Sequence, residues 1–246
     1  MATADYEVIG ENYSVLRQPD LRIAAIINSH LEAMESIVNL GAGTGSYEPE
    51  GKIIAAVEPS ETMIRQRIEK PNTAVYQAAA ENLPFESHSY DAAMAILTIH
   101  HWENWAKGLS EAYRVAKEKV VLLTWFGMPQ GFWLYDYFKE LEDLDTALFP
   151  TLEQISSVLG EVEVIPVPIP SDCTDGFLCA YWARPEMYLH AEIRSGISTF
   201  SRISNTQAGL DKLASDLKSG EWQNQYGHLL NLKEYDYGYR LVVGRK

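Results

Sequence analysis

The strongest constraint on the fold is a short apolar run that ends in three closely spaced glycines. Residues 36–46 read Ser-Ile-Val-Asn-Leu-Gly-Ala-Gly-Thr-Gly-Ser. The run predicts a buried parallel strand, and the glycines predict a turn at its carboxyl end. Glycine adopts backbone conformations that are closed to other residues, and it lets a ligand come close to the main chain. Because ligands of open α/β sheets bind beyond the carboxyl ends of the strands, this turn is the first candidate binding site.

A second apolar run ends in an acid. Residues 53–57 read Ile-Ile-Ala-Ala-Val and are followed by Glu58, Pro59 and Ser60. An acid at the end of the second strand can accept hydrogen bonds from the two hydroxyl groups of a ribose. The glycine turn and the acid together predict a nucleoside site.

Five motifs in order resemble the class I S-adenosylmethionine-dependent methyltransferases. They are the glycine turn, the segment 57–60 with Met63, the Ala-Glu-Asn-Leu-Pro-Phe segment 80–85, the Ser-Tyr-Asp-Ala-Ala segment 89–93, and a helix and strand at 109–115 and 120–124. The resemblance covers about residues 36–126. Each motif alone is weak, whereas their order and spacing make a strong signal.

The resemblance implies S-adenosylmethionine as cofactor and a set of residues that bind it. The N-terminal segment of such enzymes often folds over the methionine end of the cofactor, and an Arg suits a carboxylate because it donates two hydrogen bonds at once. For Tyr13 and Arg17, a surface Arg and a half-buried Tyr remain the alternative. The cofactor-binding candidates are Tyr13, Arg17, Gly41, Ala42, Gly43, Thr44, Gly45, Glu58, Pro59, Ser60, Met63, Ala80, Glu81 and Thr98.

The expected fold is α/β, with a Rossmann-like seven-stranded, mostly parallel sheet whose last strand is antiparallel. Strands are predicted at 36–40, 53–57, 72–77, 92–98, 119–125, 161–168 and 236–244. Helices are predicted at 21–31, 60–70, 111–117 and 152–159, with Asp20 and Ser60 as N-caps of the first two. We expect a single methyltransferase domain over 1–246, with a core of about 32–127, 161–170 and 235–246. Residues 171–231 then form a helical insertion near the C-terminus, which either caps the site or thickens the domain.

The chain departs from the family pattern around the predicted site. The first crossover, residues 41–52, is near the minimum length for a parallel connection, and Pro49 interrupts any helix in it. We therefore expect a shortened crossover with at most one helical turn, and one face of the sheet covered by another segment. Asn39 stands where the family usually has an acid, and Ala79 where it often has an Asp for the adenine amino group. That contact falls to Glu81 or to water.

The predicted fourth strand delivers candidate catalytic residues to the same edge of the sheet. Methyl transfer is an in-line displacement, and a hydroxyl or ammonium acceptor needs a base, for which histidine is suited near neutral pH. His101 is the preferred base and His100 the second candidate, with purely structural roles as the alternative. Aromatic residues near strand ends can wall an apolar substrate pocket or simply pack in the core. The substrate-binding candidates are Trp102, Trp125, Phe126 and Trp133.

Composition and charge restrict the classes of partner and the location expected for this chain. The net charge of −14 argues against a nucleic-acid partner, because phosphate contacts need clustered Lys and Arg. The chain start lacks the features of a signal peptide, and the apolar runs are too short to span a membrane, so the cytoplasm is the expected location. Two cysteines predict neither a disulfide framework nor a zinc site, and no metal is expected.

These observations favour a methyltransferase that acts on a small-molecule acceptor. Two alternatives stay open at this point: a nicotinamide-dependent oxidoreductase with the same glycine and acid geometry, and a non-catalytic member that binds the cofactor. The missing third glycine of the dinucleotide fingerprint counts against the oxidoreductase. The methylated atom and the oligomeric state are not fixed by the sequence.

Overall fold

The computed structural model describes residues 13–128 and 131–246 of the chain. The chain start, where no signal peptide is predicted, lies outside these residues. A seven-stranded sheet has the order β3-β2-β1-β4-β5-β9-β6. Its strands are β1 (Ser36–Leu40), β2 (Ile53–Val57), β3 (Thr73–Tyr76), β4 (Tyr90–Ile96), β5 (Ala116–Trp125), β6 (Val162–Pro166) and β9 (Tyr239–Arg245). Strands β1 to β5 all pair in parallel with their neighbours in this set, whereas β9 is antiparallel to both of its neighbours, β5 and β6. The predicted fold class is confirmed.

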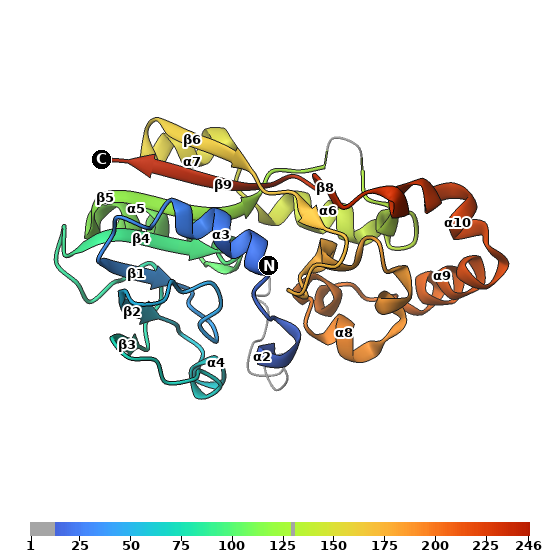
Figure 1. Cartoon of the computed structure of the whole chain (residues 1–246), viewed down its shortest axis with the longest axis horizontal. Helices are drawn as coiled ribbons and strands as arrows, with labels where there is room; N and C mark the ends of the chain where they lie inside the picture. The colour runs from blue at the N-terminus through green and yellow to red at the C-terminus, as the bar shows by residue number, and fades with distance from the viewer. Residues whose placement is uncertain (1–12, 129–130) are drawn as a thin grey trace.

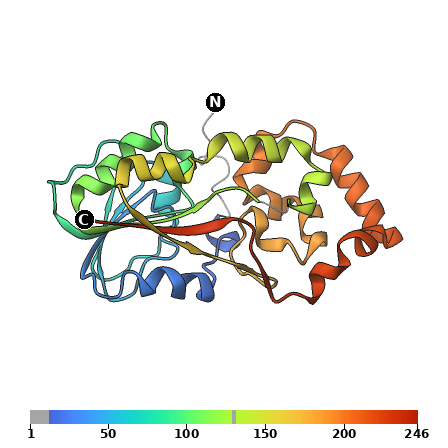
Figure 2. The same cartoon turned by 90° about the horizontal axis from the view of Figure 1, so that it is seen from above.

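Helices cover both faces of the sheet (Figure 2). Helix α3 (Leu21–Ser29) packs on one face through Ile23 and Ile27. Helices α5 (Trp105–Val115) and α7 (Leu152–Leu159) pack on the other through side chains such as Leu109 and Ile155. Helix α3 begins at the predicted cap, because Asp20 accepts a hydrogen bond from the Arg22 N–H. The α-helices are α2 (Tyr13–Leu16), α3 (Leu21–Ser29), α4 (Glu61–Arg65), α5 (Trp105–Val115), α6 (Lys139–Leu148), α7 (Leu152–Leu159), α8 (Ala191–Ser195), α9 (Gln207–Ser219) and α10 (Glu221–Tyr226).

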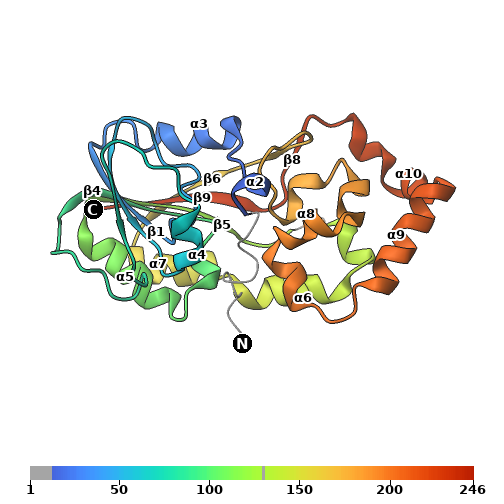
Figure 3. The ribbon, with the colours of Figure 1, turned by 90° about the horizontal axis from the view of Figure 1, so that it is seen from below.

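A helical lobe adjoins the sheet at the carboxyl ends of the parallel strands (Figure 1). It contains α6, α8, α9 and α10, which Figure 3 shows gathered beside the sheet. Its core is continuous with the α3 face of the sheet. The lobe also holds most of the short 3₁₀ helices, and a two-stranded ribbon of β7 (Ile169–Pro170) and β8 (Glu234–Tyr235) joins it to the sheet. The 3₁₀ helices are η2 (Ile99–His101), η3 (Trp133–Asp136), η4 (Leu178–Tyr181), η5 (Pro185–Leu189), η6 (Ser198–Arg202) and η7 (Gly227–Asn231).

The structure differs from the local predictions at three helices. The helix expected at 111–117 is α5, which begins at Trp105, where the Asn104 side chain caps it, and ends at Val115. The helix expected at 60–70 has its predicted cap, since Ser60 accepts from the Met63 N–H, but it ends at Arg65. Beyond that point the Arg67 guanidinium turns inward to the carbonyl oxygens of the glycine turn, which a continuing helix would not allow. Helix α6 has no counterpart among the elements predicted from the sequence. The first crossover contains turns but no helix, as expected.

Candidate active site

The glycine turn follows β1 directly and has left-handed backbone conformations at all three glycines. Gly41 has φ +60°, Gly43 has φ +51° and Gly45 has φ +90°. A Cβ atom on Gly41 would lie 2.0 Å from Thr98 Oγ1, so the turn and the end of β4 are in direct contact. On Gly43 the nearest atom is the flexible Met63 Cε at 3.3 Å. Gly41 is thus required by both conformation and space.

Glu58 lies at the carboxyl end of β2, across from the glycine turn. Its carboxylate accepts hydrogen bonds from the Gly43 N–H at 2.8 Å and from the Ser60 N–H at 2.9 Å. Burial raises the pKa of Glu58 above its ordinary value, although these N–H groups and the positive charge of Arg67 act in the opposite direction. A carboxylate has about four acceptor positions, so Glu58 retains capacity for the hydroxyl groups of a ribose.

A cleft of about 530 Å³ opens over the turn, and we call it the glycine-loop cleft. This volume is ordinary for a small-molecule site. Most of the predicted cofactor-binding residues line it: Tyr13, Gly41, Gly43, Glu58, Pro59, Ser60, Met63, Ala80, Glu81 and Thr98. Ala79, Ile96, Leu97, His101, Trp102 and Glu103 complete the lining. The Glu81 carboxylate also accepts from the Asn104 N–H at 2.9 Å, which ties the adenine-side segment to the start of α5.

Three further predicted residues line a smaller neighbour of this cleft, the N-terminal cavity of about 40 Å³. They are Arg17, Ala42 and Thr44, and they lie there together with Tyr13 and Tyr47. Gly45 lines neither space. It packs instead on the Glu48 and Arg67 side chains, where a Cβ atom would lie 3.0 Å from Glu48 Oε2.

A buried ion pair supports the glycine turn in place of the missing crossover helix. Arg67 Nη2 lies 2.6 Å from Glu48 Oε1, and the two side chains are 6% and 1% exposed. Arg67 Nη1 donates to the carbonyl oxygens of Ala42 and Gly43. Asn39 Nδ2 donates to the same Glu48 oxygen at 3.1 Å. The carboxylate expected at position 39 is therefore supplied from the loop by Glu48, a role that the irregular sequence of this loop does not signal.

The N-terminal segment is fastened to residues 171–177, which we call the strap. Arg17 Nε lies 2.6 Å from Asp175 Oδ1, and Arg17 Nη1 donates to the Tyr13 hydroxyl at 2.9 Å. The Tyr47 hydroxyl donates to the other Asp175 oxygen at 2.9 Å. Asp175 thus orients the Arg17 guanidinium. Arg17 lines both the N-terminal cavity and a third cavity, which lies between the end of β4 and the helical lobe.

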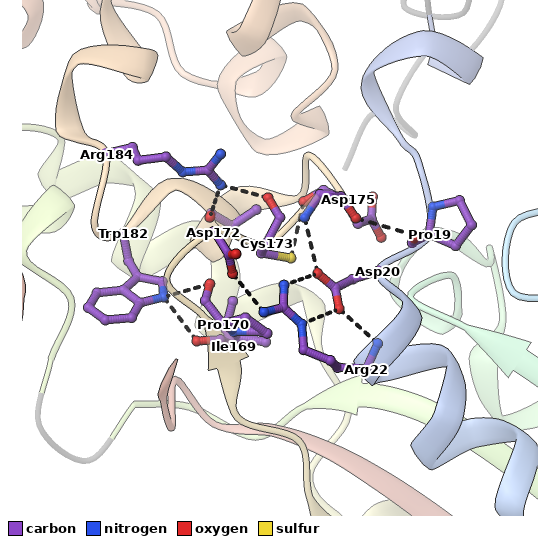
Figure 4. A network of polar contacts seen from close by, with 12 residues as sticks. Pro19, Asp20, Arg22, Ile169, Pro170, Asp172, Cys173, Asp175, Trp182 and Arg184 are labelled. Atoms are coloured by element: carbon purple, nitrogen blue, oxygen red, sulfur yellow. Dashed lines mark hydrogen bonds and ion pairs between the residues drawn. The ribbon is translucent and has the colours of Figure 1, made fainter. Parts of the chain in front are cut away.

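A second network of ion pairs and hydrogen bonds holds the strap at Asp172 and Thr174. Figure 4 shows Arg22 between the carboxylates of Asp20 and Asp172, at 2.7 Å from each. The Thr174 N–H donates to Asp20 Oδ2 at 3.2 Å. Burial opposes ionisation of Asp20, but the hydrogen bonds from Arg22 and Thr174 outweigh it and lower its pKa to about 2.

The third cavity, about 40 Å³ in volume, lies between the end of β4 and the helical lobe, and we call it the aromatic cavity. The His100 ring stacks on Phe149 with ring centroids 4.1 Å apart, and Trp125 meets Phe149 edge-on at 5.4 Å. Its lining is Arg17, Leu97, His100, His101, Trp125, Met128, Asp145, Phe149, Phe177, Leu178, Ile197, Ser198, Thr199 and Tyr239.

The two histidines proposed as bases are neutral in this environment. Burial lowers the pKa of His101 to about 3, and the positive charges of Arg202 and Arg17 act in the same direction. Burial, neighbouring His101 and the same two arginines hold the pKa of His100 well below its ordinary value. Protonation of either ring would place a new positive charge beside two arginines. His101 lines both the glycine-loop cleft and the aromatic cavity, so its position fits the prediction better than its basicity does.

The predicted substrate-binding aromatics separate in the structure. Trp125 lines the aromatic cavity, and Trp102 lines the glycine-loop cleft, where it packs against Gly108. Phe126 lines neither and packs at the edge of the α5–α7 core. Trp133 is buried in the helical lobe, with its indole N–H donating to the Trp182 carbonyl oxygen at 2.9 Å.

Leu97 is a site residue that the sequence analysis missed. It has φ +52°, a conformation that is strained for a branched side chain, and it lines all three cavities. Strain of this kind is concentrated at functional sites. Asp145, Phe149, Thr199 and Tyr239 were also missed; they come from segments far apart in sequence, and only tertiary packing brings them together.

Among the described residues, no group of three or more His, Cys, Asp or Glu side chains is placed to hold a metal ion. Within the same residues, no helix has the length and apolar character needed to cross a bilayer.

Comparison with known proteins agrees with this geometry. A family model for a methyltransferase domain matches residues 38–124. A crystal structure from Anabaena variabilis, assigned as a methyltransferase of an antibiotic biosynthesis pathway, is 35% identical, with a TM-score of 0.85 over 93% of this chain and 98% of that chain. Phosphoethanolamine N-methyltransferase 2 of Haemonchus contortus, solved with S-adenosyl-L-methionine, shares the fold at 18% identity, with a TM-score of 0.56 over 98% of this chain and 56% of that one.

A curated relative shares part of its length. The chloroplastic 2-methyl-6-phytyl-1,4-hydroquinone methyltransferase 2 of Oryza sativa subsp. japonica is 25% identical over 127 residues, which is 48% of this chain. The match spans about a third of that relative (35%).

Proposed function

The chain belongs to the class I S-adenosylmethionine-dependent methyltransferases, and we propose that it methylates a small molecule bound in the aromatic cavity. Membership in this family makes the chain an enzyme that uses S-adenosylmethionine. It decides against the nicotinamide-dependent oxidoreductase and the non-catalytic binding protein that the sequence left open.

The residues of the glycine-loop cleft fit this cofactor. We assign Glu58 as the hydrogen-bond acceptor for the ribose hydroxyl groups of the cofactor, because its buried carboxylate faces the cleft with free acceptor capacity. The adenine lies by Ala80 and Glu81 in this proposal, and the methionine end by Tyr13 and Arg17. When bound, S-adenosylmethionine supplies an electrophilic methyl group. The chain's own contribution is to align the acceptor with that group and to exclude water.

One observation carries the assignment of the acceptor site: the aromatic cavity and the glycine-loop cleft share Leu97 and His101. An acceptor in the aromatic cavity therefore borders the cofactor directly, and in this proposal the side chains around the cavity, whose volume is about 40 Å³, move apart to admit it. The stacked rings of His100 and Phe149 favour a planar or aromatic molecule. The net charge of −14 supports a small acceptor over a nucleic acid. The hydroquinone named for the rice relative and the antibiotic pathway named for the Anabaena relative support the same class.

We further propose that the chain is one domain, with the insertion at 171–231 as a cap over the acceptor. The strap supports this role, because its ion pairs with Arg17 and Arg22 fasten the insertion to the N-terminal segment. Phe177, Leu178 and Ile197 bring the insertion to the aromatic cavity. Asp145 of α6 and Phe149, which follows that helix, also line the cavity, so the cap in this proposal includes part of the chain before the sixth strand.

Radiolabelled methyl transfer tests the proposal. The protein is incubated with S-adenosylmethionine labelled in its methyl group and, in separate reactions, with small phenols and amines, with a protein mixture or with transfer RNA. Ultrafiltration then separates small from large products. We expect label in the filtrate with phenols or amines, and loss of that label in Glu58→Ala. Label retained on protein or RNA, or no label transferred to any small acceptor, contradicts the proposal.

A further inference from the structure

Asp145 lies in the acceptor site without a role in the mechanism described so far. It belongs to α6, the residue is 4% exposed, and it lines the aromatic cavity together with His100 and His101. Among the described residues that line this cavity, Asp145 is the one acid. A buried acid in an apolar site is costly unless its charge is used or neutralised.

The surroundings of Asp145 hold its carboxylate in a fixed orientation. The Tyr135 hydroxyl from η3 donates to Asp145 Oδ2 at 3.0 Å, and Thr199 from η6 forms a second side-chain hydrogen bond with it. Arg202 lies close enough to stabilise the negative charge. The titratable and charged groups that surround Asp145 are His100 and His101 of η2, Tyr135 of η3, Cys179 of η4, Arg202 of η6, Arg17 and Tyr239.

The charged neighbours distinguish Asp145 from the two histidines as an acceptor of a proton. A proton on His100 or His101 creates a buried cation beside Arg202 and Arg17. A proton on Asp145 instead removes a buried negative charge. Burial raises the pKa of Asp145 to about 7, against the opposing effects of Tyr135, Arg202 and Thr199. A general base works best when its pKa lies near the working pH, so the acid is better matched to the task than the histidines are.

We propose that Asp145 is the general base of the reaction and that the acceptor is a planar molecule with a hydroxyl or amino nucleophile. This inference rests on the proposed function. In the step, the O–H or N–H proton of the acceptor moves to a carboxylate oxygen of Asp145. The lone pair of the acceptor forms the new bond to the methyl carbon, and the electron pair of the broken C–S bond stays on sulfur. A carboxylate and a sulfonium become a neutral acid and a neutral thioether.

The charge balance of this step suits a closed, apolar site. Opposite charges that disappear together need no solvent to stabilise the products, and aromatic walls exclude water from the reaction. An aromatic thiol such as thiophenol, by contrast, is much more acidic than a phenol, whose pKa is about 10, and it provides much of its own anion near neutral pH. The requirement for Asp145 is therefore expected for phenols and amines and much less for thiols.

The first test needs no acceptor. Infrared titration of the free protein is compared with that of Asp145→Asn, and Asp143→Asn serves as a matched control because Asp143 is exposed on the same helix. We expect a protonated carboxyl band that is lost as the pH rises through the neutral range, present in the wild type and in Asp143→Asn but absent from Asp145→Asn. A wild type without such a band contradicts the proposal.

The second test measures catalysis with phenol, benzylamine and thiophenol as probe acceptors. Asp145→Asn is expected to slow transfer to phenol and benzylamine by about 100-fold or more, the usual contribution of a general base, and transfer to thiophenol by less than about tenfold. The wild-type rate should rise with pH to a plateau, and this limb should vanish in the variant. Equal losses on all three probes, an unchanged limb, or no wild-type transfer to phenol or benzylamine overturns the assignment.

Binding of S-adenosylhomocysteine by calorimetry distinguishes the two levels of failure. Unchanged binding in Asp145→Asn together with unchanged catalysis removes only the base assignment. If the wild type itself binds no S-adenosylhomocysteine, the proposed function fails first.

Discussion

Substitution of Gly41 tests whether the contact between the glycine turn and β4 shapes the cofactor site. Gly41→Ala adds one methyl group at φ +60°, where its Cβ would lie 2.0 Å from Thr98 Oγ1 and 3.0 Å from Thr98 Cγ2. Gly51→Ala is the matched control. It lies in the same crossover at φ +75° and has no heavy atom within 4 Å of the added Cβ.

The two substitutions differ by the clash alone. An Ala in a left-handed conformation costs about 1–2 kcal/mol at either position. Overpacking against Thr98 adds about 1–3 kcal/mol at Gly41. For a chain of this size, that difference corresponds to about 2–12 °C in Tm. Because the turn or Thr98 must move to admit the methyl group, we also expect S-adenosylhomocysteine affinity to fall at least about tenfold in Gly41→Ala and to stay unchanged in Gly51→Ala.

Thermal unfolding and calorimetric titration on the two variants and the wild type provide the assay. A rescue variant identifies the cause. Removing Oγ1 and Cγ2 in the double variant G41A/T98A leaves Thr98 Cβ, at 2.9 Å, as the nearest atom of that side chain. The double variant should therefore regain part of the Tm lost by Gly41→Ala. Equal Tm losses in Gly41→Ala and Gly51→Ala, with normal cofactor affinity in both, would refute the reasoning.

Two further predictions concern the supports of the cleft. Glu58 accepts hydrogen bonds from the cofactor as a carboxylate, and its pKa is raised, so S-adenosylhomocysteine affinity should fall on acidification at a higher pH than an ordinary Glu would give. Calorimetry across pH should show weaker, pH-independent binding in Glu58→Gln. A wild-type affinity that stays unchanged down to pH 4 would contradict this prediction. Arg67→Met leaves the buried Glu48 carboxylate without its main partner and should lower the free energy of unfolding in urea by about 3–5 kcal/mol. The exposed Arg65 on α4 is the control, with an expected loss below about 1 kcal/mol for Arg65→Met; equal losses would show that the Glu48–Arg67 pair does not support the turn.

The sequence predicts the sheet well because periodicity and glycine position are local signals. The apolar run before Gly41 and the short connection after it lead to β1, β2 and a crossover without a helix, all of which the structure contains. The helix after Ser60 shows the limit of such signals. Its cap is local and was predicted, whereas its end depends on Arg67 reaching Glu48 across the turn, which no local pattern encodes.

The same distinction applies to the site. Glu58 is identified by its place at a strand end, and it lies in the cleft. Asp145 and Thr199 come from the helical lobe, where no motif marks them, and they are recognised only once packing places them with His101 around one cavity. Trp133 shows the converse case: an aromatic near a strand end that was expected to line the substrate pocket but is buried in the helical lobe.

Calorimetric titration of S-adenosylhomocysteine and then NADH into the purified protein tests whether the glycine-loop cleft binds S-adenosylmethionine. We expect one site with micromolar affinity for S-adenosylhomocysteine, marked weakening of that binding in Glu58→Ala, and no heat from NADH. Binding of NADH without S-adenosylhomocysteine, or of neither compound, would contradict the assignment of the glycine-loop cleft.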